Sequence, residues 1–130
     1  TYAFCLEHGP EGDIYVGGIS QGEMTMEGYL ARLQPDGGLS SVQFLTNVTE
    51  VRDLAALPDG RLVLASVTGQ GLQLVSPKGE PDHSFQPAPE LAGRIRDVVT
   101  WNNGQLLAAG SFPDGRALVP FYADGSVADT

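Results

Sequence analysis

Three apolar runs, each preceded by a glycine-containing turn, have the length and composition of β-strands. They cover residues 13–19, 61–67 and 105–112. Each run is about seven residues long, which is short for a helix, and glycine inside two of them disfavours a helix further. Because polar residues interrupt the runs so rarely, a strand formed by any of them must be covered on both faces. The pattern therefore predicts strands that lie inside a stack of sheets.

Two sets of turns show that these runs belong to a repeat. The glycines of the first set, 48 and 44 positions apart, are Gly12, Gly60 and Gly104. Those of the second set, 42 and 46 positions apart, are Gly37, Gly79 and Gly125. Asp-Gly and Asn-Gly steps between apolar runs are strong hairpin signals. We expect type I′ turns at the Asp-Gly steps, which begin with Asp36, Asp59, Asp114 and Asp124.

Further runs complete each unit of the repeat. Third strands are expected at residues 29–33, 71–75 and 117–121, and a more polar fourth strand follows, as at residues 39–46. Four antiparallel strands in about 45 residues are typical of one β-propeller blade. The sequence thus predicts an all-β, propeller-like fold of about three four-stranded antiparallel blades. It forms one segment, 1–130, with repeats at approximately residues 1–46, 47–86 and 87–130.

Composition and charge exclude several classes of function. The 130 residues suit one domain, and 7 Lys and Arg against 16 Asp and Glu give a net charge of −9. This charge disfavours a nucleic-acid-binding surface and docking on anionic lipid. We expect no membrane insertion, because no apolar run approaches the roughly 20 residues that cross a bilayer. The single cysteine excludes an internal disulfide, and we expect no cofactor, because no nucleotide-binding or metalloprotease motif occurs.

Several segments resemble the delta-60 repeat family, whose signature runs roughly "aRln-DG-lD-sF". The resemblance lies in residues 29–44, 72–85 and 118–130, and the turns at 57–62 and 109–112 resemble the other half of the signature. Departures occur at Ser40, at Pro81–Asp82 and at Ala65–Ser66. The resemblance implies a propeller of mostly uncharacterised function, extracellular, in large bacterial surface proteins or in phage virions. It supplies no catalytic residues.

Three blades do not close a ring, since propellers have about four to eight. The chain begins at Thr1 without a signal-peptide pattern, so we expect it to be part of a longer polypeptide. The expected partner is a protein, namely further blades of the same polypeptide or of another copy in a homo-oligomer. The chain alone is not expected to be a stable closed monomer, because its outer sheets would be uncovered.

Candidate reactive groups are few. Cys5 and His8 could form a nucleophile–base pair, but three positions apart on a strand they point to opposite faces. A half-buried structural thiol is the favoured interpretation. The Asp-Gly turns lack the density of oxygen ligands that calcium requires, so we expect no metal site.

An Arg-Asp pair recurs in the second and third units, as Arg52–Asp53 and Arg96–Asp97. On an inner strand these residues could line the central channel, or they could link neighbouring blades by ion pairs. We favour the structural role, because the polar residues repeat together with the blades. Cys5 stands at the position of the two aspartates.

The predicted function is a non-catalytic interaction or structural module of a larger surface or virion protein. An enzyme propeller, a hydrolase or lyase with its site at the channel mouth, is the alternative. A lectin-like propeller would need an aromatic residue in each blade. Trp101 is the only tryptophan, and the equivalent residues Gly9 and Leu57 are not aromatic.

The loops between the second and third strands differ in length, and such variable loops often carry function. They cover residues 20–28, 68–71 and 113–116. We expect a protein-contact face around the longest loop, which includes both methionines, a residue type suited to adaptable surfaces. Its predicted residues are Glu23, Met24, Met26, Glu27, Glu90 and Phe112. Shortening residues 21–27 should then impair partner contact while the fold survives.

Overall fold

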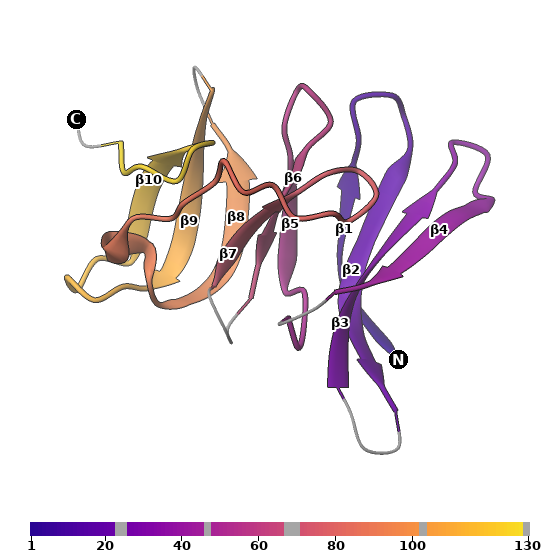
Figure 1. The fold of residues 1–130 in the computed structure, drawn as a ribbon, viewed down its shortest axis with the longest axis horizontal. Helices are drawn as coiled ribbons and strands as arrows, with labels where there is room; N and C mark the ends of the chain where they lie inside the picture. The colour runs from indigo at the N-terminus through magenta and orange to yellow at the C-terminus, as the bar shows by residue number, and fades with distance from the viewer. Residues whose placement is uncertain (23–25, 46–47, 67–70, 102–103, 129–130) are drawn as a thin grey trace.

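The structure is a computed structural model that describes residues 1–22, 26–45, 48–66, 71–101 and 104–128. It contains three antiparallel sheets that stand side by side in chain order (Figure 1). Blade 1 consists of β1 (Tyr2–His8), β2 (Ile14–Gln21), β3 (Met26–Leu33) and β4 (Leu39–Phe44). Blade 2 consists of β5 (Asp53–Ala56), β6 (Leu62–Ala65) and β7 (Leu72–Val75). Blade 3 consists of β8 (Arg94–Thr100), β9 (Gln105–Ser111) and β10 (Leu118–Tyr122), and a short 3₁₀ helix, η1 (Pro89–Leu91), precedes it.

Blade 1 has the four strands predicted, whereas the sheets of blades 2 and 3 have three strands each within the described residues. Within the described part of the chain, the fourth segment of blade 2 makes one bridge, Val75–Pro81, and that of blade 3 makes one, Phe121–Val127. In blade 2 the bridge is flanked by two hydrogen bonds, from the Ser76 N–H to the Glu80 carbonyl and from the Asp82 N–H to the Leu74 carbonyl, both at 2.8 Å, and the pairing ends there. After Pro81 the Asp82 carboxylate accepts a hydrogen bond from the Ser84 N–H, which favours a turn over a strand.

The turns are not type I′, because Pro58 stands at the first central position of the turn and proline cannot adopt the positive φ that type I′ requires there. In this turn the Gly60 N–H donates to the Leu57 carbonyl at 2.9 Å, and the Leu57 N–H donates to the Arg61 carbonyl at 2.8 Å. Gly60, at φ +94°, therefore follows the turn in a left-handed conformation. Pro35-Asp36-Gly37 is built in the same way, and each aspartate accepts a hydrogen bond from the second N–H beyond it.

The central strand β6 is buried on both faces, as its continuous hydrophobicity predicts. Leu62 and Leu64 belong to an apolar cluster shared with blade 1, which includes Tyr15, Leu30 and Val51. Val63 and Ala65 belong to a second cluster shared with blade 3. Successive residues of one strand thus point into two different cores, and this alternation holds the three blades together as one stack.

The inner strands β1, β5 and β8 adjoin one another across the stack. Asp53 of β5 accepts a hydrogen bond from the backbone N–H of Val98 on β8, at 2.9 Å. At the equivalent position of β1, the Cys5 thiol lies 3.7 Å from the Gly17 carbonyl and 3.9 Å from the Val51 carbonyl. The same position in the repeat therefore joins each blade to the next. None of the helices in the described residues is long and apolar enough to span a membrane.

Candidate functional site

A cavity of about 300 Å³ opens where the first turns of all three blades meet. Its lining is His8, Gly9, Pro10, Ala56, Leu57, Pro58, Thr100, Trp101, Gly104 and Gln105. These residues come from the β1–β2, β5–β6 and β8–β9 connections and the adjoining strand ends. Figure 1 places the three connections on one side of the stack, the upper side in that view. We call this cavity the upper pocket.

One repeated hydrogen bond brings the three turns into equivalent positions. The N–H of Gly9 donates to the Asp13 carbonyl at 2.8 Å, and the N–H of Trp101 donates to the Gln105 carbonyl at 2.7 Å. Leu57 makes the corresponding bond in blade 2. The side chains at this position therefore gather in one place, but they differ in exposure: Leu57 is 5% exposed and Trp101 is 50% exposed. Trp101 is the largest exposed apolar side chain of the described lining.

The described lining of the upper pocket suits binding better than catalysis. His8 is the only ionisable side chain of that lining, and no carboxylate or thiol belongs to it. General acid–base catalysis needs a partner group at hydrogen-bond distance. Among the described residues, no group of three or more His, Cys, Asp or Glu is placed to hold a metal ion. Apolar walls with a few polar groups are typical of a binding pocket.

Cys5 is the half-buried structural thiol that the sequence favours. Burial, together with the nearby Asp53 carboxylate, raises its pKa to about 12. The reactive thiolate is therefore scarce at neutral pH. Cys5 faces blade 2, whereas His8 lines the upper pocket, so the two do not form a nucleophile–base pair.

The Arg-Asp pair of blade 2 has the structural role that we favoured, with different contacts. Arg52 lies over the ring of Phe4 in blade 1, 4.5 Å from its centroid, and pairs with Glu50 of its own segment at 3.1 Å. Asp53 reaches the Val98 N–H of blade 3. These links across blades are a cation–π contact and a hydrogen bond, not the ion pairs we expected.

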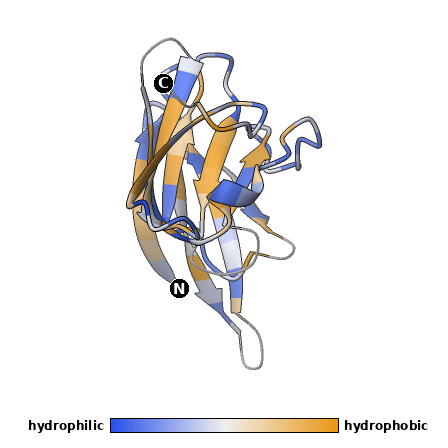
Figure 2. Ribbon diagram, turned by 90° about the vertical axis from the view of Figure 1, so that its left-hand side faces the viewer, coloured by the Kyte–Doolittle hydropathy of each residue, from blue (hydrophilic) through white to orange (hydrophobic). Residues whose placement is uncertain are grey.

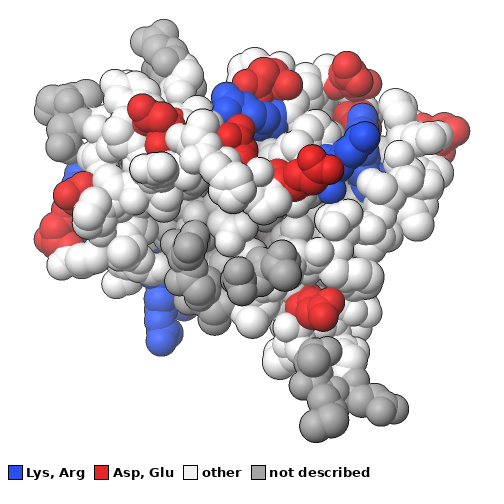
Figure 3. Space-filling model, in the orientation of Figure 1, with Lys and Arg blue, Asp and Glu red and all other residues white. Residues whose placement is uncertain are grey.

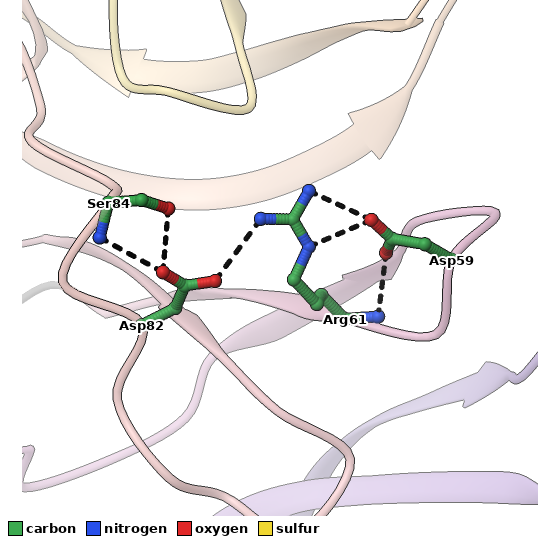
Figure 4. A network of polar contacts seen from close by, with 4 residues as sticks. All are labelled: Asp59, Arg61, Asp82 and Ser84. Atoms are coloured by element: carbon green, nitrogen blue, oxygen red, sulfur yellow. Dashed lines mark hydrogen bonds and ion pairs between the residues drawn. The ribbon is translucent and has the colours of Figure 1, made fainter.

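A second polar feature, on the turns of blade 2, has a structural role (Figure 4). Arg61 lies between Asp59, at 2.8 Å, and Asp82, at 3.2 Å, and Ser84 donates to Asp82 from both its hydroxyl and its N–H. The two Ser84 hydrogen bonds and Arg61 lower the pKa of Asp82 to about 2. The network fixes the segment after β7 against the β5–β6 turn, in place of a fourth strand.

Charged side chains of both signs lie along the upper edge of the face in Figure 3. In blade 1 Arg32 pairs with Asp13, a buried carboxylate that also accepts a hydrogen bond from the Tyr15 hydroxyl. Burial and the nearby Asp13 charge raise the pKa of Tyr15. This ion pair lies within blade 1, and no carboxylate belongs to the described lining of the upper pocket.

The residues of the predicted contact face lie in different settings in the structure. Glu23 and Met24 lie outside the described residues. Met26 and Glu27 are exposed, but they belong to β3, because β2 and β3 extend further than expected and pair Gln21 with Met26. Glu90 is exposed on η1.

Phe112 was wrongly placed on that face. It is 5% exposed and belongs to the cluster between blades 2 and 3. Its carbonyl accepts from the Gly115 N–H and its N–H donates to the Arg116 carbonyl, so it starts the turn with its ring in the core. Sequence reasoning also missed the upper pocket, although the alignment of Gly9, Leu57 and Trp101 was the signal for it.

The comparisons with known proteins establish the fold. No family model and no curated protein matches the sequence. Among solved structures, the chain is similar to the WD40 domain of Neurospora crassa Pan2, with a TM-score of 0.62 and 11% identity over 98% of this chain and 37% of that one. It is also similar to a chain of a nidogen/laminin complex, with a TM-score of 0.62 and 11% identity over 91% of this chain and 42% of that one. The chain thus spans about two fifths of each, and its fold is that of part of a β-propeller.

Proposed function

We propose that the chain is a non-catalytic β-propeller module that binds a short segment of another protein in the upper pocket. The half-exposed Trp101 at the meeting point of three equivalent turns carries this proposal. Tryptophan is among the residues that contribute most to protein interfaces, and aromatic grooves also accept extended, proline-containing peptides. The prolines and Leu57 give the rest of the pocket an apolar wall.

The single tryptophan makes the proposal directly testable, because its fluorescence reports on the pocket alone. Peptides are selected from a random phage-displayed library on the wild-type chain, with counter-selection on Trp101→Ala. The selected peptides should shift the Trp101 emission to shorter wavelength and bind Trp101→Ala at least about tenfold more weakly. Tyr2→Ala removes another exposed aromatic ring, one that does not line the upper pocket, and should leave binding unchanged. Peptides that bind Trp101→Ala as well as the wild type would show that the pocket is not the site.

The setting of the module is a second part of the proposal. The resemblance to the delta-60 repeat supports membership in that family and a place in a large bacterial surface protein or a phage virion. Labelling of intact cells or purified particles with an antibody against the chain tests the setting. Signal only after lysis would exclude a surface or virion position.

A further inference from the structure

The two outermost sheet faces of the stack, one on blade 1 and one on blade 3, are both apolar. They are different surfaces, because one faces the side of a preceding blade and the other the side of a following blade. The outer face of blade 1 presents Leu6, Val16, Leu33, Leu39, Val42 and Phe44. The outer face of blade 3 presents Val99, Leu107, Ala109, Leu118, Pro120 and Tyr122. Figure 2 turns the blade 3 end toward the viewer and shows hydrophobic residues along its strands. Within the described residues, no blade covers the outer face of blade 1 or that of blade 3.

The repeat identifies what each outer face would contact. Leu6 on the blade 1 face corresponds to Leu54 in blade 2 and Val98 in blade 3, and these two are 1% and 2% exposed, whereas Leu6 is 69% exposed. Leu118 on the blade 3 face is 54% exposed. Its counterparts Leu30 and Leu72, in blades 1 and 2, are 2% and 1% exposed. The same positions are thus buried at both interfaces inside the chain and open at its ends.

Polar groups on the two faces match in the same way. Asp53 accepts a hydrogen bond from the Val98 N–H of the next blade, and Asp97 occupies the place of Asp53 on the exposed face of blade 3. Leu6 is the counterpart of Val98 in blade 1, so its backbone N–H is the equivalent donor for Asp97. Arg52 lies over Phe4 of the preceding blade. Arg96 occupies the bulge of β8, the position that Phe4 occupies in β1. A copy of blade 1 placed after blade 3 would therefore bring its Phe4 beside Arg96.

We propose that a second copy of this chain covers these faces, with blade 3 of each copy packed against blade 1 of the other. The two contacts are identical, and each joins unlike faces, so the pair closes on itself as a six-bladed ring, within the range of four to eight blades. The interface continues the geometry already present between blades 1 and 2 and between blades 2 and 3. The inference goes beyond peptide binding, and its test is separate because Leu6 and Leu118 do not line the upper pocket. Trp101 is the counterpart of Leu57, which is buried between blades 2 and 3, so the ring would also bring a blade beside Trp101.

Light scattering after gel filtration tests the pairing with two charge-bearing variants. The wild-type chain should have twice the 13.7 kDa of one copy. Leu6→Arg alone and Leu118→Arg alone should each be monomeric, because each spoils both contacts of the ring. A mixture of the two should recover a dimer, because one contact then joins the intact blade 3 of the first variant to the intact blade 1 of the second. Both side chains are exposed within one copy, so circular dichroism should show an unchanged fold.

A matched control and three contrary results complete the experiment. Glu80→Arg changes an exposed residue of the middle blade and should leave the dimer intact. A monomeric wild type up to the highest soluble concentration would overturn the proposal. So would dimers of Leu118→Arg alone, which would mean that one face pairs with itself. Masses above two copies would overturn the closed ring, because unlike faces that do not close form filaments.

Discussion

Phe85 and Phe44 each end a segment of similar sequence in successive repeats, yet only one of them is in the core. Phe85 is 7% exposed and its ring meets that of Phe121 edge to face, with centroids 6.3 Å apart, between blades 2 and 3. Replacing a buried Phe with Ala costs about 3–5 kcal/mol, because it loses the transfer free energy of the ring and leaves a cavity. Phe85→Ala should therefore lower the free energy of unfolding by roughly that amount.

Phe44→Ala is the matched control, with the same chemical change at a side chain that is 54% exposed. Full burial of a large apolar side chain stabilises by about 1.5–3 kcal/mol, so a half-exposed one contributes roughly 1 kcal/mol. Urea unfolding, followed by circular dichroism at a concentration where both variants have the same mass, should separate the two by about 2 kcal/mol or more. Equal losses, or a loss below about 1 kcal/mol for Phe85→Ala, would refute the assignment of Phe85 to the interface between blades.

Three further predictions concern the turns, the thiol and the response to acid. Gly60→Val and Gly104→Val should each cost more than about 1 kcal/mol in thermal unfolding, since both glycines have positive φ (+94° and +77°) and valine is strained there. Unchanged midpoints would mean that these backbones relax. Cys5, with its pKa raised to about 12, should react with a disulfide reagent at pH 8 far more slowly in the native chain than in urea, and equal rates would contradict its burial. Asp82, with its pKa lowered to about 2, should stabilise the fold above pH 4 and lose that effect as the pH falls from 4 toward 2, so the stability difference from Asp82→Asn should shrink over that range.

Most of the architecture could be predicted because its signals are local. The continuous hydrophobicity of residues 61–67 predicts a strand covered on both faces, and β6 indeed divides its side chains between two cores. The period of the turn glycines predicts the blades, and all of Gly12, Gly37, Gly60, Gly79, Gly104 and Gly125 have positive φ. The turn type was also readable, since a proline at the first central position of a turn excludes type I′.

The errors arise where packing between blades decides the outcome. Phe112 follows a strand and precedes a Pro-Asp-Gly turn, which is typical of an exposed loop. Its ring nevertheless enters the core, because the turn begins at Phe112 itself. The three-stranded sheets of blades 2 and 3 differ from the expectation because the length of the repeat alone suggested four strands in each blade. The period counts residues and does not distinguish a ladder from a turn.

Predicting the upper pocket requires both the sequence repeat and the packing of the blades against one another. The repeat places Gly9, Leu57 and Trp101 at one structural position, and stacking of the blades then brings the three turns to one cavity. A purely architectural position would carry similar residues in each blade, as Leu30 and Leu72 do in the cores. Here the three residues differ in kind: Leu57 is buried against blade 3, whereas Trp101, on blade 3 itself, is half exposed beside the open outer face of that blade. Since function in a repeat fold is carried by departures from the repeat, Trp101 is the residue whose replacement should separate binding from folding.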